Sequence, residues 1–242
     1  MSEAKRERHI VAVGGAGFSA ETGNLALERY VTDLTGKARA RVCFIPTASG
    51  DSQSYIDRFF AASEQLPWEP SVLSLFRGET PDLASVVFNQ DLIYVGGGNT
   101  RNMLVLWRDW GLDKLMREAW ERGIVLTGVS AGSICWFEQG VTDSVPGSLN
   151  PLTCLGFLAG SNCPHYNSEA ERQPSYTRFV GGGEMLPGYA TDDGVALHYT
   201  GTELHRVISW IPGGRAFCVE RDGDASIETL IEPEFLADLI DG

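Results

Sequence analysis

The sequence predicts an α/β fold: a doubly wound, mostly parallel sheet with helices on both faces and antiparallel additions toward the C-terminus. Three observations predict it. Short β-type runs alternate with longer helical stretches in the first half of the chain. Loops of glycine and other small residues follow the predicted strands. Beyond about residue 140 short apolar runs separated by turn residues take over, which is typical of antiparallel strands. We expect one domain over residues 1–242.

The first half of the chain supplies five predicted strands and the helices between them. The strands are short apolar runs at His9–Val13, Arg41–Ile45, Ser71–Leu75, Asp91–Val95 and residues 123–127. The helices are longer stretches at residues 22–36, 52–65, 80–88 and 100–120. Because parallel neighbours need a crossover connection, this alternation indicates a parallel sheet.

The C-terminal part of the chain has a different pattern. Short apolar runs at Val207–Ile211, Ala216–Val219 and Ser226–Ile231 predict antiparallel strands or an edge extension of the sheet. A short helix is expected near residues 233–240. The chain shows no internal repeat and no linker that would divide it.

The small-residue loops lie where a site is expected. They occupy residues 14–17, 46–50, 96–100 and 128–132, each after a predicted strand. In open α/β sheets ligands bind outside the carboxyl ends of the strands. The sequence therefore predicts a functional site at this edge of the sheet.

Composition excludes several classes of partner. The formal net charge of −13 disfavours binding to nucleic acid or to an anionic membrane, since both need a basic surface. No run approaches the ~18 apolar residues of a membrane span, and the charged N-terminus does not resemble a signal peptide. The five cysteines are scattered, with no Cys-x-x-Cys pair. We expect a soluble, cytoplasmic protein with neither nucleic-acid nor membrane partners.

Residues 128–132 carry the strongest chemical signal in the chain. They read Gly-Val-Ser-Ala-Gly, between the apolar run 123–127 and a helical stretch. Gly-x-Ser-x-Gly at such a corner is typical of a nucleophile elbow, in which the serine hydroxyl projects above the sheet edge. The flanking glycines permit the crowded backbone. We predict that Ser130 is a catalytic nucleophile rather than a small residue in a tight turn.

A serine hydroxyl needs a neighbouring base, and the chain has four histidines. His9 precedes the first strand, at the wrong end of the sheet. His198 and His205 lie in the C-terminal part, where a structural role is the default. His165 follows Pro164 in a stiff, polar loop. We therefore predict that His165 is the general base.

The acid that would orient this histidine has several candidates. Asp143 is the first choice, because it follows the predicted elbow helix and lies between the serine and the histidine in sequence. Glu138 lies on the same segment and is the alternative. Asp192 and Asp193 begin a later strand and remain possible.

Acyl transfer also develops an oxyanion, which backbone N–H groups must meet at about 3 Å. Ala131 follows the nucleophile and offers one such amide, and Gly97 or Gly98 should supply the other. A phosphate cradle at residues 96–100 is disfavoured, because the Gly-Lys-Ser/Thr of a P-loop is missing. No metal-ligand spacing is present, so we expect neither a metal nor a cofactor.

Three linked motifs resemble one family, peptidase E, the cytoplasmic aspartyl dipeptidases, with cyanophycinase as a relative. They are Val95-Gly-Gly-Gly-Asn-Thr100, Gly128-Val-Ser-Ala-Gly132 and Cys163-Pro-His-Tyr-Asn167, in the family's order and at about its spacing. The resemblance covers most of residues 9–180. It implies a flavodoxin-like sheet related to class I glutamine amidotransferases, a Ser-His-acid triad without metal, and hydrolysis of dipeptides with an N-terminal aspartate.

The resemblance also implies roles for individual residues. Ser130 and His165 match the nucleophile and the base, and Gly97 and Ala131 match the oxyanion donors. Asp143 falls near the family's acid only with a two-residue gap. The family binds the aspartyl side chain through an arginine downstream of the histidine, for which Arg172 and Arg178 are available here; a bidentate arginine suits a buried carboxylate.

Two other functions remain open from the sequence. An α/β-hydrolase-type esterase would share the elbow, but no His-Gly-Gly motif precedes it and His165 follows Ser130 by only 35 residues. A non-catalytic, amidotransferase-like binding module is the third possibility. For the peptidase we expect a small peptide as substrate and either a monomer or a homodimer.

Overall fold

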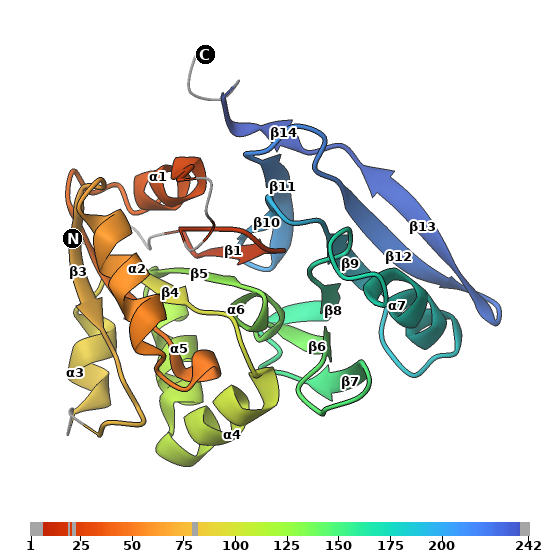
Figure 1. Ribbon diagram of the computed structural model, residues 1–242, viewed down its shortest axis with the longest axis horizontal. Helices are drawn as coiled ribbons and strands as arrows, with labels where there is room; N and C mark the ends of the chain where they lie inside the picture. Colours follow the sequence, from red (N-terminus) through yellow and green to blue (C-terminus); the bar gives the residue numbers. More distant parts are fainter. Residues whose placement is uncertain (1–6, 19, 21–22, 79–81, 238–242) are drawn as a thin grey trace, which may run out of the picture.

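The computed structural model describes residues 7–18, 20, 23–78 and 82–237, which form two β-sheets with helices packed around them (Figure 1). The larger sheet has eight described strands in the order β14-β11-β10-β1-β5-β4-β2-β3. The smaller has six, in the order β13-β12-β9-β8-β6-β7. The site predicted from the sequence draws on both sheets.

The centre of the larger sheet is parallel. Its strands are β1 (His9–Val13), β2 (Ala40–Ile45), β3 (Trp68–Val72), β4 (Leu92–Val95) and β5 (Val125–Val129). They pair as β1–β5, β5–β4, β4–β2 and β2–β3, all parallel. On the other side of β1, β10 (Val195–Thr200) and β11 (Glu203–Ser209) add antiparallel strands, and the short β14 (Glu234–Phe235) follows β11. The predicted fold class, a mostly parallel sheet with antiparallel additions, is confirmed.

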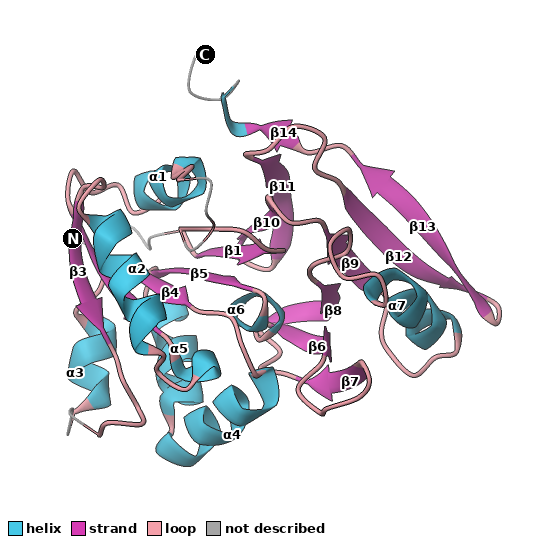
Figure 2. Ribbon diagram, in the orientation of Figure 1, coloured by secondary structure: helices cyan, strands magenta, loops and turns pink. Residues whose placement is uncertain are grey.

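Helices cover both faces of this sheet (Figure 2). The helical segments are α1 (Ala26–Asp33), the 3₁₀ turn η1 (Thr47–Ser49), α2 (Gln53–Ser63), α3 (Leu83–Phe88), α4 (Thr100–Trp110), α5 (Leu112–Glu121), α6 (Ala131–Ile134) and α7 (Arg172–Gly181). Helices α1 and α2 pack on one face around Phe44 and Phe59. Helices α3, α4 and α5 pack on the other, around Trp107 and Trp120. Burying both faces explains why the parallel strands read as continuous apolar runs.

The second sheet is the largest departure from the predicted architecture. Its strands are β6 (Phe137–Thr142), β7 (Asn150–Thr153), β8 (Leu158–Cys163), β9 (Gly188–Thr191), β12 (Ala216–Asp222) and β13 (Ala225–Ile231). Strands β6, β8 and β9 are parallel, whereas β7, β12 and β13 pair antiparallel. Helix α7 covers one face through its own core. The sequence indicated antiparallel strands here but not the parallel trio.

Several predicted boundaries shift for identifiable reasons. The helix expected at 100–120 is two helices, because Gly111 adopts a left-handed conformation with φ 70°. The strand expected at Ser71–Leu75 lies three residues earlier and contains Pro70, which β3 tolerates as an edge strand. Of the helix expected at 233–240, residues 234–235 form β14, residues 236–237 are helical and residues 238–240 lie outside the described residues.

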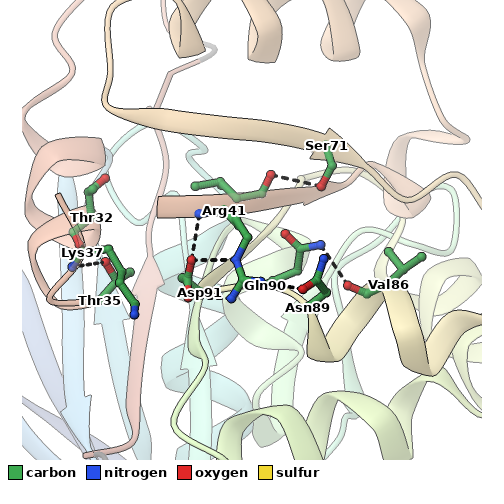
Figure 3. A network of polar contacts seen from close by, with 10 residues as sticks. Thr32, Thr35, Lys37, Arg41, Ser71, Val86, Asn89, Gln90 and Asp91 are labelled. Carbon is green, nitrogen blue, oxygen red and sulfur yellow. Dashed lines mark hydrogen bonds and ion pairs between the residues drawn. The ribbon is translucent and has the colours of Figure 1, made fainter. Parts of the chain in front are cut away.

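An ion pair ties the amino ends of two central strands together, at the edge of the sheet away from the glycine loops (Figure 3). Asp91, just before β4, accepts hydrogen bonds from the Arg41 backbone N–H at 2.9 Å and from its Nε and Nη2 at 3.1 Å. Burial raises the pKa of Asp91, but the bonds from Arg41 outweigh it and hold that pKa below its usual value. Arg41 also contacts Asn89.

The described residues contain neither a membrane-spanning helix nor a cluster of potential metal ligands. None of the helices there combines the length and the apolar composition needed to cross a membrane. No three histidine, cysteine, aspartate or glutamate side chains in that part of the chain converge as metal ligands would.

Candidate active site

Ser130 occupies a tight corner between β5 and α6. Its backbone has φ 57° and ψ −112°, a conformation that is strained for any residue with a side chain. Both neighbouring glycines are required. A Cβ at Gly128 would lie 2.4 Å from the Gly132 carbonyl oxygen, and one at Gly132 would lie 2.3 Å from that of Val95. The side chain of Ser130 is therefore held at the carboxyl edge of the sheet by a turn that only this glycine spacing allows.

The end of β1 and the residues that follow it bind the backbones of the other candidate site residues. Three successive carbonyl groups accept backbone hydrogen bonds from distant parts of the chain: Val13 from Ser130 at 3.2 Å, Gly14 from His165 at 3.2 Å, and Gly15 from Gly194 at 3.0 Å. Because these carbonyls belong to consecutive residues, the backbones of Ser130, His165 and the turn at 193–194 gather around one strand end.

His165 is paired with Asp193. The Nδ1 atom of the imidazole lies 2.7 Å from Asp193 Oδ1. His165 follows β8 and has φ 58°, so it is, like Ser130, one of the few described non-glycine residues with a positive φ. Such strained conformations cluster at functional sites. An ionised Asp193 accepts a hydrogen bond from the Nδ1–H group, which keeps the proton on Nδ1 and leaves Nε2 of a neutral imidazole free to act as a base.

The surroundings of Asp193 favour its charged form. Burial raises the pKa of Asp193, but hydrogen bonds from His165 and Ser168 and the charge of Arg172 outweigh burial, so the pKa lies below its usual value. The Asp193 backbone N–H donates to Asn167 Oδ1 at 3.0 Å. The residues just after His165 thus position the carboxylate that orients its ring.

Gly15 fits directly against this pair. A Cβ at Gly15 would lie 1.8 Å from Asp193 Oδ1 and 2.7 Å from His165 Nδ1. No side chain can therefore occupy position 15 while the two residues stay hydrogen-bonded. The sequence marked residues 14–17 as a small-residue loop at a strand end, but gave no reason to connect Gly15 with His165.

Asp143, the first choice for the acid, is not the carboxylate that the structure places at His165. Asp143 is exposed in the loop after β6, and among the described residues the carboxylate that accepts from the His165 ring is Asp193. The neighbouring Ser144 anchors that loop to the start of α4 instead, through the Asn99 side chain and the Arg101 N–H. Asp143 lies between Ser130 and His165 in sequence, but this position does not make it the hydrogen-bond partner of His165.

The other carboxylates are engaged elsewhere. Glu138 is exposed on β6, where its Oε2 accepts the Gly160 N–H at 2.8 Å. Asp192 is buried and accepts from Arg215 Nε at 2.9 Å. Asp193, kept only as a later possibility from the sequence, is the carboxylate at the histidine.

The amides predicted as oxyanion donors, those of Gly97 and Ala131, belong to the backbone near Ser130. Gly97 packs against the serine, since a Cβ there would lie 3.2 Å from Ser130 Cβ and 3.8 Å from Oγ. Its N–H makes a long contact of 3.5 Å to the Tyr55 hydroxyl. The Ala131 N–H is the first amide of α6 and has no acceptor among the described residues. Gly98 has φ 135°, and a Cβ there would lie 2.3 Å from the Ala48 carbonyl oxygen.

The two arginines that the resemblance singled out lie on α7. Arg172 is 3% exposed; its Nε donates to Glu169 at 2.6 Å and its Nη1 to the Val141 carbonyl at 2.8 Å. Arg178 is exposed near the end of α7, where it pairs with Glu184 at 3.5 Å. Of these two arginines, Arg172 is the one whose charge acts on Asp193.

The remaining histidines form a separate cluster. His9 Nδ1 lies 3.0 Å from His198 Nε2, and the His198 and His205 rings are 5.4 Å apart. His198 Nδ1 also contacts the Tyr30 hydroxyl at 2.7 Å. Of the four histidines, His165 is thus the one whose backbone is bound next to that of Ser130, at the end of β1.

Comparison with known proteins bears on the family and the fold. Residues 10–207 match the sequence model of Peptidase family S51. Peptidase YgaJ of Bacillus subtilis (strain 168) is 51% identical over 212 residues, covering 88% of this chain and 92% of that protein. Peptidase E of Pasteurella multocida (strain Pm70) is 28% identical over 188 residues, covering 73% and 77%. The crystal structure of a peptidase from an acI-B1 actinobacterium shares the fold, with TM-score 0.70 at 17% identity, covering 96% of this chain and 98% of that one.

Proposed function

The chain belongs to peptidase family S51, and on that basis we propose that it is a serine peptidase in which Ser130 is the nucleophile, His165 the general base and Asp193 the acid that orients it. The observation that carries this proposal is the 2.7 Å bond between His165 and Asp193. It gains weight because adjacent carbonyls, of Val13 and Gly14, bind the backbones of Ser130 and His165.

The geometry supports an acyl-enzyme mechanism. His165 takes the proton from the Ser130 hydroxyl as its oxygen attacks the scissile carbonyl, and the ionised Asp193 stabilises the imidazolium that forms. The amides of Gly97 and Ala131 donate to the oxyanion of the tetrahedral intermediate. His165 then gives its proton to the leaving amine. Water, activated by the same imidazole, hydrolyses the ester of Ser130 and regenerates the free enzyme.

For the substrate we propose small peptides, and specifically dipeptides with an N-terminal aspartate. The support is the resemblance of the three motifs to the aspartyl dipeptidases and the match to Peptidase E of Pasteurella multocida. Of the two arginines, we favour Arg172 as the source of positive charge for the aspartyl side chain, because its charge reaches Asp193. Arg178 is paired with Glu184 at the far end of the same helix.

A small dipeptide panel tests the proposal. Asp-X, Glu-X, Asn-X and Ala-X are incubated with the wild type and with Ser130→Ala, and a fluorophosphonate probe reports whether Ser130 is activated. We expect selective cleavage of Asp-X and labelling of Ser130, both lost in the variant. Substantial cleavage by Ser130→Ala would overturn the mechanism. Labelling without cleavage of any peptide would overturn the substrate, and ester hydrolysis alone would favour the esterase.

A further inference from the structure

Helix α1 carries a buried carboxyl group that the proposed mechanism does not use. Glu28 is 0% exposed. Its Oε1 accepts the Phe18 backbone N–H at 2.6 Å, whereas its Oε2 has no hydrogen-bond partner among the described residues. An unpartnered buried oxygen costs free energy and is uncommon in folded proteins. The position of Glu28 therefore needs a reason beyond packing.

A second unpartnered group faces this carboxyl. The Tyr94 hydroxyl is buried on β4 and also lacks a hydrogen-bond partner in the described part of the chain, although it lies close enough to favour the ionised form of Glu28. Gly17 packs against both groups. A Cβ there would lie 2.5 Å from the Tyr94 hydroxyl and 3.4 Å from Glu28 Oε1. The backbone of Gly17, the Tyr94 hydroxyl and the Glu28 carboxyl group are therefore close neighbours.

The two residues next to the Glu28 carboxyl group, Phe18 and Tyr94, belong to backbone segments that continue into the candidate active site. Residues 14–18 form the segment after β1, and the carbonyls of Gly14 and Gly15 in it bind His165 and Gly194. Tyr94 is the penultimate residue of β4, and the strand continues into the loop that contains Gly97. Glu28 therefore lies between the segment 14–18 and β4, the two backbone segments that lead to the site.

Aromatic packing makes this connection stiff. The Phe18 ring lies 5.0 Å from the Tyr94 ring and 5.5 Å from the Tyr55 ring, centre to centre. The Tyr55 hydroxyl in turn accepts the Gly97 N–H, and a Cβ at Gly96 would lie 3.0 Å from the Tyr55 ring. A shift of Phe18 is therefore transmitted to the loop beside Ser130, because close-packed side chains cannot move independently.

We propose that Glu28 is a positioning residue whose carboxylate holds the segment 14–18 and β4 in register, so that the alignment of the active site is regulated by the protonation of this one buried group. The inference rests on the proposed function, and it adds a means of regulation at the same site. The ionised form accepts the Phe18 N–H and is favoured by the nearby Tyr94 hydroxyl, and charge-assisted hydrogen bonds are about twice as strong as neutral ones. The neutral form holds the two segments more weakly.

The environment of Glu28 puts this titration in the physiological range. Burial raises the pKa of Glu28 to about 7, against the opposing effects of the backbone hydrogen bonds and of Tyr94. The titratable groups around it are Tyr94 on β4 and, next to Tyr94, Tyr55 on α2. No charged side chain of the described residues is among the groups that act on this carboxyl.

Two measurements on Glu28→Gln test the proposal, since glutamine keeps the acceptor for Phe18 but cannot ionise. The first is infrared titration of the protonated carboxyl C=O band from about pH 5 to about pH 9. We expect a band that disappears near pH 7 in the wild type and is missing in the variant. The second is the rate of fluorophosphonate labelling of Ser130. We expect Glu28→Gln to react about fivefold more slowly than the wild type at high pH and equally at low pH.

Each failure has a separate meaning. A wild type without a carboxyl band that titrates near pH 7 would overturn the inference, and so would identical pH profiles of labelling in the wild type and Glu28→Gln. A wild type whose Ser130 does not react with the probe at any pH would instead overturn the proposed function, while the infrared titration would still report on Glu28.

Two further variants keep the test informative if Glu28→Gln does not fold. Tyr94→Phe removes a group that lowers the pKa of Glu28, so we expect the midpoints of both titrations to move upward; an unchanged midpoint would contradict the proposal. Tyr30→Phe is the matched control on the same helix. It removes the 2.7 Å contact with His198 Nδ1 and should destabilise the fold without altering the pH profile of labelling.

Discussion

The two sheets contribute to the candidate site in different ways. The eight-stranded sheet supplies Ser130 and the amides beside it, through a corner whose backbone is fixed within a few residues of sequence. The six-stranded sheet supplies His165 and Asp193 from loops that follow two parallel strands, β8 and β9. The comparison teaches that a candidate nucleophile can be located from local spacing, whereas the carboxylate that meets the candidate base depends on which strand ends become neighbours.

If the two sheets form one catalytic unit, removing either contribution should be equally damaging. We expect Ser130→Ala and His165→Ala each to lower the catalytic rate about 10⁶-fold, and the double variant to be no worse, because residues of a triad act as a unit. Steady-state hydrolysis of an Asp-X dipeptide measures this. Ser133→Ala is the control: its hydroxyl bonds Asn162 in the interior, so activity should stay near that of the wild type.

The assignment of the acid to the six-stranded sheet is tested by a pair of isosteric changes. We expect Asp193→Asn to lower the rate about 10⁴-fold, because an amide can leave His165 in the wrong tautomer. Asp143→Asn, in the exposed loop, should change the rate less than about threefold. Equal losses in the two variants, measured under the same conditions, would remove Asp193 from its proposed role.

The contact between the two sheets can be disturbed without substituting a proposed catalytic residue. In Gly15→Ala the new methyl group would collide with Asp193 Oδ1 and His165 Nδ1. A displacement of about 1 Å can cost about 10²-fold in rate, so we expect a loss of that order. Gly182→Ala serves as the control, since a Cβ there comes no closer than 3.1 Å to another atom. Thermal melting separates a local effect at position 15 from global unfolding.

The smallest expected effect concerns stability at the histidine cluster. Burial, helped by nearby His9, His205 and Arg206, lowers the pKa of His198 to about 3. The unfolded chain binds this proton below about pH 6.5 while the fold excludes it, so stability is lost as the pH falls. The loss at pH 5 relative to pH 8 is about 2 kcal/mol, or roughly 5 °C in melting temperature.

Melting curves of the wild type and His198→Gln across this range check the prediction, and the variant should show the shallower acid loss. Glu28 acts with the opposite sign. Its raised pKa means that stability is lost as the pH rises from about 4.5 to about 7. The difference between the two proteins, rather than the wild-type curve alone, therefore isolates His198. Parallel curves would contradict the assignment.

The parallel half of the fold followed from sequence because its signals are local. Glycine or proline at a strand end and helical spacing of apolar residues each act within about one turn or strand. Where a local signal was ambiguous, the boundary moved. The strand predicted to begin at Ser71 begins at Trp68 and includes Pro70, and Gly111 splits a helix that apolar spacing alone made continuous.

The second sheet was less accessible from sequence. Strands β6, β8 and β9 are parallel, but only β8 and β9 are joined by a crossover helix, α7, whereas β6 reaches β8 through the short strand β7. Their neighbours are chosen by burial against α7 and the larger sheet, which no short stretch encodes. The composition of the loops after these strands was evident from the sequence, but which loops lie next to each other was not.

The sequence by itself determined the parallel α/β fold and the corner at Ser130, because glycine spacing and apolar periodicity constrain the backbone locally. It also singled out His165 by its loop. Only the tertiary structure decided that Asp193, and not Asp143, meets this histidine. That choice depends on the carbonyls of residues 13–15, which draw segments far apart in the chain to one strand end. Hydrogen bonds over such separations exist only once the sheets have packed together.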